Sequence, residues 1–247
     1  MLYEAPAELL TNKILLVTGA GDGIGRVAAR TYAAHGATVI LLGKTTAKLE
    51  AVYDEIVAAG HPEPGIAPMD LANVEPQAIQ ELAEVIEQQY GRLDGLLHNA
   101  SILGDRAPLE HYDLNLWSRV IQVNLNAVFM LTRILLPALR QSAQASLLFT
   151  SSSVGATPRA YWGPYAVSKY GMEGMAKLFA EELENTSNIR VNIINPGATR
   201  TRMRAAAYPN ENPATVKVPE DLMPLYLYLM GDDSAGVNGK TFNANSW

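Results

Sequence analysis

The sequence predicts an α/β protein built on a doubly wound, mostly parallel sheet of seven strands with helices on both faces. Short runs of apolar and β-branched residues alternate with longer helical patterns, and this alternation is typical of βαβ units. The strand candidates are apolar almost throughout, as expected for strands that helices cover on both sides. Because 48% of the 247 residues are hydrophobic, a large core can form.

Seven strand candidates follow one another along the chain. They are the apolar runs 13–17, 38–42, 66–69, 95–97, 146–150, 189–194 and 240–243. Helical patterns lie between or after them, at 23–35, 46–59, 75–90, 114–140, 164–184 and 219–230. The longest pattern, 114–140, predicts one helix that ends near Pro137 or just beyond it.

No internal repeat, low-complexity segment or linker divides the chain. We therefore expect residues 1–247 to form a single domain. Two segments, about 101–113 and 200–218, read as loops and follow strand candidates at their carboxyl ends. Ligands bind at that end of open α/β sheets, so these segments are the predicted substrate loops.

Charge and cysteine content exclude several classes of protein. The net charge of −6 argues against a nucleic-acid partner, because neutralising phosphates needs a basic surface. The absence of cysteine excludes disulfides, thiolate metal sites and a cysteine nucleophile. The four histidines are not spaced as metal ligands, so no metal site is expected.

The N-terminal residues lack the basic region and apolar run of a signal peptide. No apolar run approaches the roughly 18–20 residues that a membrane helix needs. We therefore expect a cytoplasmic protein with no membrane partner.

The segment 18–25, Thr-Gly-Ala-Gly-Asp-Gly-Ile-Gly, joins the first strand candidate to the first helix. A dinucleotide pyrophosphate needs a tight turn, a bare backbone and a helix N-terminus aimed at it, and Gly19, Gly23 and Gly25 can supply these. The spacing is G-x-x-x-G-x-G, because Ile24 occupies the third glycine position of the usual motif. A structural turn is the alternative, but the second strand ends about 20 residues further on, which favours a dinucleotide. The predicted cradle consists of Gly19, Gly21, Asp22, Gly23, Ile24 and Gly25.

The end of the second strand indicates which nicotinamide cofactor binds. An acidic residue there would hydrogen-bond the ribose 2′-hydroxyl of NAD, whereas a cation accommodates the 2′-phosphate of NADP. Gly43 stands at that position and Lys44 follows it, so we expect NADP(H) to be preferred over NAD(H). A solvated lysine that opens a helix is the alternative for Lys44, and the Asp22 carboxylate argues against an additional phosphate.

Tyr165 and Lys169 are four residues apart in a helical pattern that Pro164 can begin. Residues at this spacing lie on one face of a helix, about 5–6 Å apart at Cβ. A tyrosine phenol has a pKa of about 10 and is a poor acid at neutral pH. A nearby ammonium favours the phenolate, so we expect Lys169 to lower the pKa of Tyr165 and make it a proton donor or acceptor. Considered alone, the spacing is more typical of an exposed pair on a helix.

With the cradle, Tyr165 and Lys169, the whole chain resembles the short-chain dehydrogenase/reductase family, in its short, single-domain branch with a Rossmann-type fold. Segment 18–25 matches the TGxxxGxG motif of the family. Further matches are Asp70 and Leu71 after the third strand, Asn99 in an NNAG-like segment, Asn124, Ser152, and the PGxxxT stretch 196–201. More narrowly, segments 149–155 and 223–233 resemble the bacterial YciK-like oxidoreductases.

The resemblance implies which residues contact the cofactor. Asp70 would contact the adenine, and the stretch 196–201 would hold the nicotinamide carboxamide. The implied contacts outside the cradle are Lys44, Asp70, Leu71, Asn99, Tyr165, Lys169, Pro196, Gly197, Thr199 and Thr201.

The resemblance also implies hydride transfer between the nicotinamide and a carbonyl compound or secondary alcohol. Tyr165 would be the general acid or base, and Ser152 would join it in stabilising charge on the carbonyl oxygen. Lys169 would also bind the nicotinamide ribose, and Asn124 would hold a water that links Lys169 to solvent. Ser152 is assigned over its two serine neighbours only by its spacing of thirteen residues from Tyr165.

Two residues depart from the family pattern. Ser101 stands where the family has glycine, and we expect its hydroxyl to crowd or hydrogen-bond the cofactor site. His98 stands in the same segment, and we expect a buried, hydrogen-bonded histidine rather than a catalytic one.

The sequence does not name the substrate. The predicted pocket lining comes from 101–113, 154–162 and 202–216. Candidates for an apolar wall are Tyr161, Trp162 and Met203. Candidates for binding an anionic group are Arg159, Arg202 and Arg204, with surface arginines as the alternative.

Three alternatives to an NADP(H)-dependent oxidoreductase stay open at this point. They are an NADP-binding regulator without turnover, an NAD-preferring dehydrogenase of the same family, and a sugar-nucleotide epimerase or dehydratase, for which the chain leaves little room. By resemblance we also expect a homodimer or homotetramer, formed through the faces of 114–139 and 164–183. The C-terminal residues 243–247 depart from the usual glycine-rich end of the family, which argues against tetramer contacts there.

Overall fold

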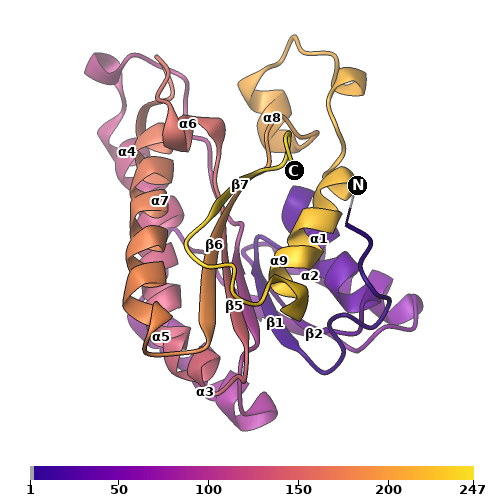
Figure 1. The fold of residues 1–247 in the computed structure, drawn as a ribbon. Helices are drawn as coiled ribbons and strands as arrows, with labels where there is room; N and C mark the ends of the chain where they lie inside the picture. Colours follow the sequence, from indigo (N-terminus) through magenta and orange to yellow (C-terminus); the bar gives the residue numbers. More distant parts are fainter. Residues whose placement is uncertain (1–2) are drawn as a thin grey trace.

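The structure, a computed structural model, describes residues 3–247 and contains one seven-stranded sheet. Its strands lie in the order β3-β2-β1-β4-β5-β6-β7, and each neighbouring pair is parallel (Figure 1). They are β1 (Ile14–Thr18), β2 (Thr38–Gly43), β3 (Gly65–Pro68), β4 (Gly95–His98), β5 (Ala145–Thr150), β6 (Ile189–Asn195) and β7 (Thr241–Asn243). The predicted doubly wound α/β fold is confirmed, and the described sheet is parallel throughout.

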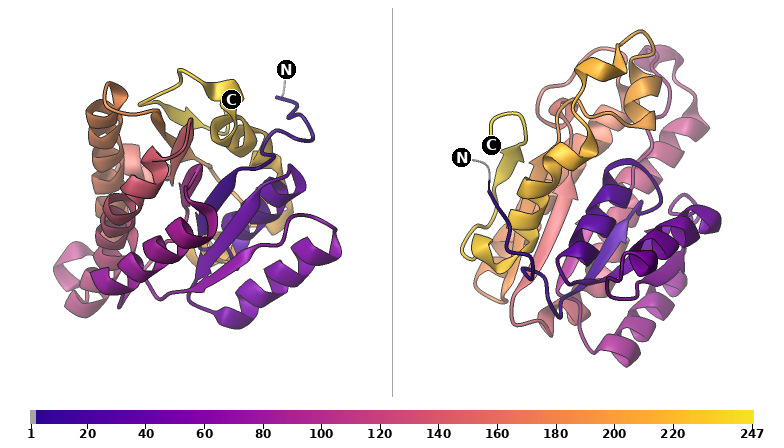
Figure 2. Two further views of the ribbon diagram at one scale, coloured as in Figure 1. Left: turned by 90° about the horizontal axis from the view of Figure 1, so that it is seen from below. Right: turned by 90° about the vertical axis from the view of Figure 1, so that its right-hand side faces the viewer.

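Helices cover both faces of this sheet (Figures 1 and 2). One face carries α1 (Gly23–Ala34), α2 (Thr46–Ala58) and α9 (Met223–Met230). The other carries α3 (Pro76–Tyr90), α5 (Ala127–Arg140) and α7 (Gly163–Glu184). The shorter elements are η1 (Leu109–His111), α4 (Leu114–Ile121), η2 (Gln122–Asn126), α6 (Ser153–Ala156), α8 (Arg202–Ala207), η3 (Pro213–Thr215), η4 (Pro219–Leu222) and η5 (Asp232–Ser234).

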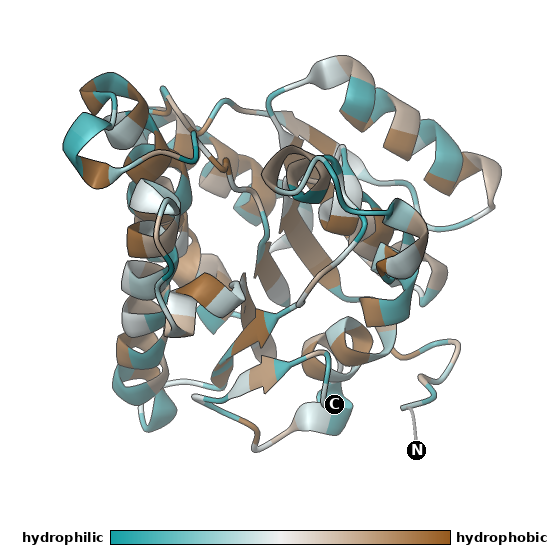
Figure 3. Cartoon of the chain, turned by 90° about the horizontal axis from the view of Figure 1, so that it is seen from above, coloured by the Kyte–Doolittle hydropathy of each residue, from teal (hydrophilic) through white to brown (hydrophobic). Residues whose placement is uncertain are grey.

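Successive residues of the central strand β1 enter different cores, because side chains alternate across a strand. Leu15 and Val17 pack with α1, α2 and α9, whereas Ile14 and Leu16 pack with α3, α5 and α7. Every residue of β1 is buried, which explains its continuous apolar run. Figure 3 shows the same pattern, with largely apolar strands inside and helices of mixed polarity around them.

The strand order places the ligand-binding end of the sheet. β1 pairs with β2 on one side and with β4 on the other, so the connections leave it in opposite directions. Such a reversal opens a crevice at the carboxyl ends of the strands. The loops that follow β1, β4, β5 and β6 therefore meet at this edge (Figure 2).

The structure corrects the prediction of one continuous helix over 114–140. The π-helical turn η2 interrupts it between α4 and α5, and α5 then continues past Pro137 to Arg140. By length and composition the run Leu114–Arg140 could cross a membrane, which the expectation from the sequence missed. In the fold, 44% of its most apolar stretch is buried, and Leu131 and Leu135 pack in the core.

The predicted helix 219–230 is likewise divided, into η4 and α9. Each part has a proline near its start, Pro219 and Pro224. Proline has no N–H to donate and clashes with the preceding turn, so the helix is divided, and α9 begins at Met223, one residue before Pro224.

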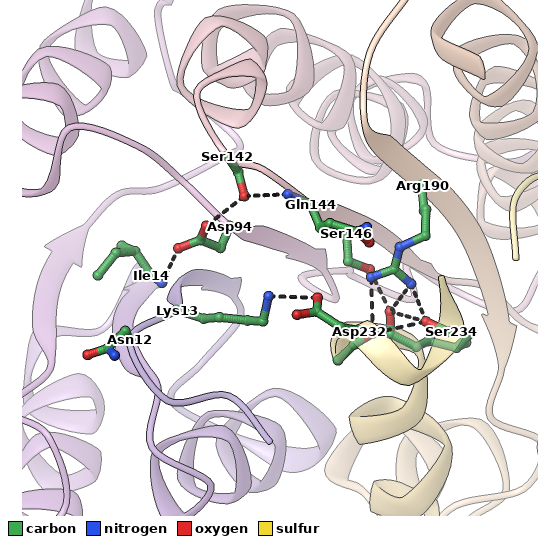
Figure 4. Close-up of polar contacts among 12 residues, drawn as sticks. Asn12, Lys13, Ile14, Asp94, Ser142, Gln144, Ser146, Arg190, Asp232 and Ser234 are labelled. Atoms are coloured by element: carbon green, nitrogen blue, oxygen red, sulfur yellow. Dashed lines mark hydrogen bonds and ion pairs between the residues drawn. The ribbon is translucent and has the colours of Figure 1, made fainter. Parts of the chain in front are cut away.

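Buried polar contacts join the amino ends of the strands, opposite the crevice (Figure 4). Asp94 accepts hydrogen bonds from the Ile14 N–H at 2.8 Å and from the Ser142 hydroxyl at 2.6 Å. Arg190 of β6 donates to the Gly231 carbonyl oxygen at the end of α9 over 3.0 Å. These contacts tie β1, β4, β5, β6 and α9 together at the edge away from the site.

Candidate active site

A cleft of about 430 Å³ opens at the carboxyl ends of the strands. It brings together the predicted site residues Gly19, Gly21, Asp22, Gly23, Ile24, Lys44, Asp70, Leu71, Asn99, Ser152, Tyr165, Lys169, Pro196, Gly197, Thr199 and Thr201. Two predicted site residues, Gly25 and Asn124, do not line it. Most of the lining comes from loops that are remote from one another in sequence.

The glycine cradle is shaped by close backbone approach. Gly19 has a φ of +69°, and a Cβ there would lie 3.0 Å from the Cα of Ala100. A Cβ on Gly25 would lie 2.3 Å from the carbonyl oxygen of Gly19. Gly25 therefore lets helix α1 pack closely against the cradle, and its predicted contact with the cofactor stays a prediction. Gly23 begins α1, so the N-terminus of that helix faces the cleft.

Asp22 carries an ion-pair cluster that sequence reasoning missed. Its carboxylate caps α1 by accepting from the Gly23 N–H at 2.8 Å. The same carboxylate pairs with Lys48 at 2.5 Å and with Arg202 at 3.3 Å. Partial burial acts to raise the pKa of Asp22, but hydrogen bonds from Lys48 and Arg202 outweigh it, and the pKa is lowered. The positive charges of Lys48 and Arg202 offset the negative charge of Asp22. The Asp22 carboxylate therefore opposes a phosphate at this site less than the sequence alone predicts.

The end of β2 presents basic groups to the cleft. Gly43, Lys44, Thr45 and Lys48 line it together. The Thr45 side chain makes no cap for α2, so the first N–H groups of that helix stay available to a ligand. Lys48 lies in the first turn of α2, four positions after Lys44, and a second lysine this close to the end of β2 is the signal by which it could have been found.

Asp70 shapes its own loop while lining the cleft. Its carboxylate accepts from the Ala72 N–H at 3.1 Å and from the Asn73 side-chain amide at 3.2 Å. These bonds hold the segment after β3 in a turn and place Leu71 in the lining.

Tyr165 and Lys169 lie on the inner face of α7 and are both buried. The Lys169 Nζ lies 5.7 Å from the ring centre of Tyr165 and donates to the Thr150 carbonyl oxygen at 2.8 Å. Burial raises the pKa of Tyr165 to about 12, and hydrogen bonding with Ser152 acts in the opposite direction. The expectation of a lowered pKa at Tyr165 is therefore wrong for the ligand-free protein, because loss of water outweighs the hydrogen bond with Ser152. Burial also lowers the pKa of Lys169 to about 8, against a smaller effect of Glu173.

The structure distinguishes Ser152 from its serine neighbours. Ser151 is buried and donates from its hydroxyl to the Glu173 carboxylate. Ser153 is exposed and lies outside the cleft lining. Ser152 precedes α6 and lines the cleft with Tyr165. Of the three hydroxyls, that of Ser152 is therefore the one available to a ligand beside the phenol.

Asn124 holds the loop after β4 in place through side-chain hydrogen bonds. It lies in the π-helical turn, and its amide both accepts from the Ile102 N–H and donates to the Ile102 carbonyl oxygen, each at 2.9 Å. It also donates to the Ser168 hydroxyl at 3.1 Å, and Ser168 donates to the Tyr165 carbonyl oxygen at 2.8 Å. Both amide hydrogens are engaged, so the side chain fixes the loop after β4 against α7 instead of reaching the cleft.

The two departures from the family pattern have different environments. Ser101 lines the cleft, and its buried hydroxyl has no hydrogen-bond partner within residues 3–247. His98 is buried, bonds to the Thr132 hydroxyl at 2.8 Å and stacks on Phe149 with ring centres 4.9 Å apart. Burial lowers the pKa of His98 to about 3, so the residue is a neutral, packed histidine as expected.

The loop after β6 completes the cleft. Gly197 has a φ of +69°, and a Cβ there would meet the Asn245 side chain. Thr201 caps α8 by accepting from the Arg204 N–H at 3.1 Å. The chain thus turns sharply at Gly197 and presents Pro196, Thr199 and Thr201 to the cleft.

The predicted substrate residues divide into two groups. Trp162 and Met203 line the cleft, whereas Tyr161 is 55% exposed and lies outside the lining. Arg202 and Arg204 line it too, but each is paired with a carboxylate. Arg159, the third arginine predicted to bind an anion, is exposed and outside the lining.

The residues present fit a dinucleotide with phosphate groups. The Gly19 backbone leaves space that a side chain would fill, and the N-terminus of α1 supplies donors and a positive dipole end. The unpartnered Ser101 hydroxyl offers a further buried hydrogen-bonding group. Such a group is costly to leave unpaired, so a bound ligand that satisfies it gains affinity.

Comparison with known proteins agrees with this geometry. Residues 13–212 match the family model described as short chain dehydrogenase. The oxidoreductase YciK of Escherichia coli K12 is 51% identical over 99% of this chain and 96% of its own. A short chain dehydrogenase of Shigella flexneri complexed with NADP is 51% identical, has a TM-score of 0.95 and covers 97% of this chain and 100% of its own. One from Escherichia coli CFT073 complexed with NADPH is 52% identical, with a TM-score of 0.94 and coverage of 97% and 99%. The chain therefore belongs to the short-chain dehydrogenase/reductase family of oxidoreductases.

Proposed function

We propose that this oxidoreductase transfers a hydride between NADP(H) and a carbonyl compound or secondary alcohol, with Tyr165 as the general acid or base. The observation that carries the proposal is the convergence of Ser152, Tyr165 and Lys169 beside the glycine cradle, in one cleft. When bound, the nicotinamide supplies a hydride to the carbonyl carbon or accepts one from an alcohol.

The side chains account for the proton. As the carbonyl oxygen gains negative charge, the hydroxyls of Ser152 and Tyr165 donate hydrogen bonds to it. Tyr165 is protonated at neutral pH because its pKa is about 12, and it gives its proton to that oxygen to form the alcohol. The Lys169 ammonium, 5.7 Å from the ring centre, stabilises the phenolate left behind until a proton from solvent replaces the one lost. In the oxidation direction the same proton moves are reversed.

The preference for NADP(H) rests on charge at the end of β2. Lys44 and Lys48 line the cleft beside Gly43, which has no side chain to exclude a 2′-phosphate. The two homologues complexed with NADP and NADPH support this choice. With NADP(H) bound, the Lys48 ammonium would either exchange its ion pair with Asp22 for one with the 2′-phosphate or contact both anions.

One experiment tests both parts of the proposal. A panel of ketones, aldehydes and secondary alcohols is assayed by nicotinamide absorbance with NADPH, NADH and their oxidised forms, using Tyr165→Phe as the blank. We expect turnover with NADP(H) that exceeds turnover with NAD(H) and disappears in the variant. Tight NADPH binding without turnover of any compound would favour an NADP-binding regulator, and higher efficiency with NADH would favour an NAD-dependent dehydrogenase.

We also propose that the protein forms a homodimer or homotetramer through α5 and α7. Phe129, Val167 and Leu178 are between 45% and 61% exposed on these helices. Large apolar side chains exposed on these two helices support an interaction surface there. Light scattering of purified protein, with Leu178→Arg as the disrupting variant, tests the assignment. A wild-type monomer contradicts it.

A further inference from the structure

An aromatic compartment of the cleft adjoins the Tyr165 phenol. The Trp162 ring centre lies 5.7 Å from that of Tyr165 and 6.0 Å from that of Tyr208. Together with Ala207, Trp162 and Tyr165 belong to a buried apolar cluster, against which Met203 and Tyr208 pack. Trp162, Met203, Ala207 and Tyr208 also line the cleft, so a ligand beside the phenol meets apolar and aromatic surface.

An unusual backbone turn places Trp162 in this wall. Tyr161 has a φ of +70°, in the left-handed region that non-glycine residues rarely occupy, while its side chain is 55% exposed. Gly163 follows with a φ of +39°, and a Cβ there would lie 2.9 Å from the Tyr112 ring. The turn leaves Trp162 only 8% exposed. Backbone strain of this kind gathers at functional sites, and here it orients one side chain of the compartment.

Two arginines that line the cleft beside the compartment, Arg202 and Arg204, are already paired with carboxylates. The Arg204 guanidinium donates to the Glu211 carboxylate from Nε at 2.7 Å and from Nη2 at 2.5 Å, and it lies 3.8 Å from the centre of the Tyr208 ring. Arg202 pairs with Asp22 at 3.3 Å. An anion that entered the compartment would lose its hydration. Neither arginine is free to pair with it, so the desolvation would not be compensated by these two residues.

Arg106 joins the three segments that surround the compartment. Its guanidinium lies 4.9 Å from the Trp162 ring centre and 5.3 Å from that of Tyr208, and it donates to the Ala207 carbonyl oxygen at 2.8 Å. These contacts connect the loop after β4 to the start of α7 and to α8. Arg106 is not among the residues that line the cleft. It therefore stabilises the aromatic wall by cation–π contact, with its guanidinium held by the two rings and the Ala207 carbonyl oxygen.

We propose that this compartment binds the uncharged, apolar body of a ketone or of the matching secondary alcohol, with aryl or alicyclic character, and selects against anionic substrates. This substrate class rests on the proposed function, because the compartment matters for catalysis only if Tyr165 serves a carbonyl oxygen. The neutralised arginines and the aromatic wall are the two observations that carry it.

A set of matched aryl ketones tests the selection. The amide 4-acetylbenzamide and the carboxylate 4-acetylbenzoate have nearly the same shape and differ in charge, and 4-isopropylacetophenone has a similar outline without polar groups. We expect kcat/KM with NADPH to be at least about tenfold lower for the carboxylate than for either neutral ketone, because the charge must be desolvated without a partner. Equal or better use of the carboxylate overturns the inference while leaving the proposed function intact.

A variant then tests whether paired arginines cause the selection. Glu211→Gln releases Arg204 from its carboxylate, so the catalytic efficiency for the carboxylate ketone, relative to that for the amide, should rise several-fold. Glu220→Gln, at an exposed position, removes the same charge elsewhere and should leave this ratio unchanged. If both variants change the ratio equally, overall charge and not the compartment controls the choice, and the inference fails.

Binding separates this inference from the proposed function. Calorimetric titration of the protein saturated with NADP⁺ measures affinity for the amide and carboxylate ketones without turnover. If no carbonyl compound is reduced, the proposed function fails, and tighter binding of the neutral amide still supports the compartment. Tighter binding of the carboxylate, or no binding of either compound, overturns it.

Discussion

The Lys169 Nζ donates a hydrogen bond to the carbonyl oxygen of Thr150 over 2.8 Å. This contact ties α7 to the last residue of β5, and Ser152 follows two positions later. It therefore fixes the relative positions of Ser152, Tyr165 and Lys169 before any ligand binds. Preorganised donors of this kind lower the cost of stabilising charge during a reaction.

Tyr165→Phe should reduce turnover by at least about a hundredfold, because the proposed proton donor is lost. NADPH affinity should change little, since the phenol serves the reaction more than the binding. Steady-state kinetics and a fluorescence titration with NADPH measure the two effects. Tyr161→Phe, at an exposed position, is the control and should retain activity. Normal turnover in Tyr165→Phe would refute the assignment.

Lys44→Ala should weaken NADPH binding about tenfold or more, because a hydrogen bond to a charged phosphate contributes roughly 1.5–3 kcal/mol. NADH binding should change little, because NADH has no 2′-phosphate. Lys48→Ala should act in the same direction if Lys48 also reaches the phosphate. The exposed Lys177→Ala serves as the control. Equal losses for NADPH and NADH in Lys44→Ala would contradict the assignment to NADP(H).

Ser101→Ala should stabilise the cofactor-free protein by about 1 kcal/mol, because it removes a buried hydroxyl that has no partner in the described chain. If a bound cofactor satisfies that hydroxyl, the same change should weaken NADPH binding several-fold. Thermal denaturation with and without NADPH measures both effects. Stability that falls in the cofactor-free variant would show that the hydroxyl is already satisfied.

Gly25→Ala should destabilise the protein by about 2 kcal/mol or more, because its Cβ would lie 2.3 Å from the Gly19 carbonyl oxygen and force the cradle to shift. Gly174→Ala is the matched control: it is also in a helix, with nothing within 4 Å of the added Cβ. There the higher helix propensity of alanine should stabilise the protein slightly. Urea denaturation of both variants tests the difference, and a neutral Gly25→Ala would contradict the packing described.

His98 should make stability depend on pH. Its pKa is about 3 in the fold, against 6.5 for an ordinary histidine. Between these values the unfolded chain binds a proton that the folded chain does not, so the free energy of unfolding falls as the pH is lowered from 6.5 toward 3. The contribution of this one proton is about 1.4 kcal/mol per pH unit.

Urea denaturation at several pH values measures this effect. His98→Gln should flatten the slope, whereas His111→Gln, whose side chain is 74% exposed in the native residue, should not. Only the slope is diagnostic, since either substitution can change stability by a constant amount. An unchanged slope in His98→Gln would mean that His98 is protonated in the fold.

Much of the fold could be predicted because burial on both faces of a parallel sheet leaves a direct trace in sequence. β1, β2 and β5 appear as largely apolar runs, and the helices between them follow from their periodicity. The interruption of the 114–140 helix could not be predicted. A π-helical turn preserves helical composition, and Asn124 takes part in it through contacts with Ile102 and Ser168, which lie far away in sequence.

Much of the cleft could also be predicted, because backbone requirements are local. The tight turn between β1 and α1 requires glycine at positions 19 and 23. Tyr165 and Lys169 lie on one face of α7 because they are separated by one helical turn. The packing role of Gly25 could not be predicted, because close backbone approach and direct contact with a ligand require the same residue type.

By itself the sequence determined the order of strands and helices, the cradle and the identity of the groups that carry the proposed chemistry. Only the tertiary structure decided their electrostatics. It paired Asp22 with Arg202 across 180 positions of chain, and it raised the pKa of Tyr165 by burial where proximity to Lys169 alone predicted the reverse. The reason is physical: the strength and sign of an electrostatic effect depend on distance and on loss of water. Both quantities exist only once distant segments have packed together.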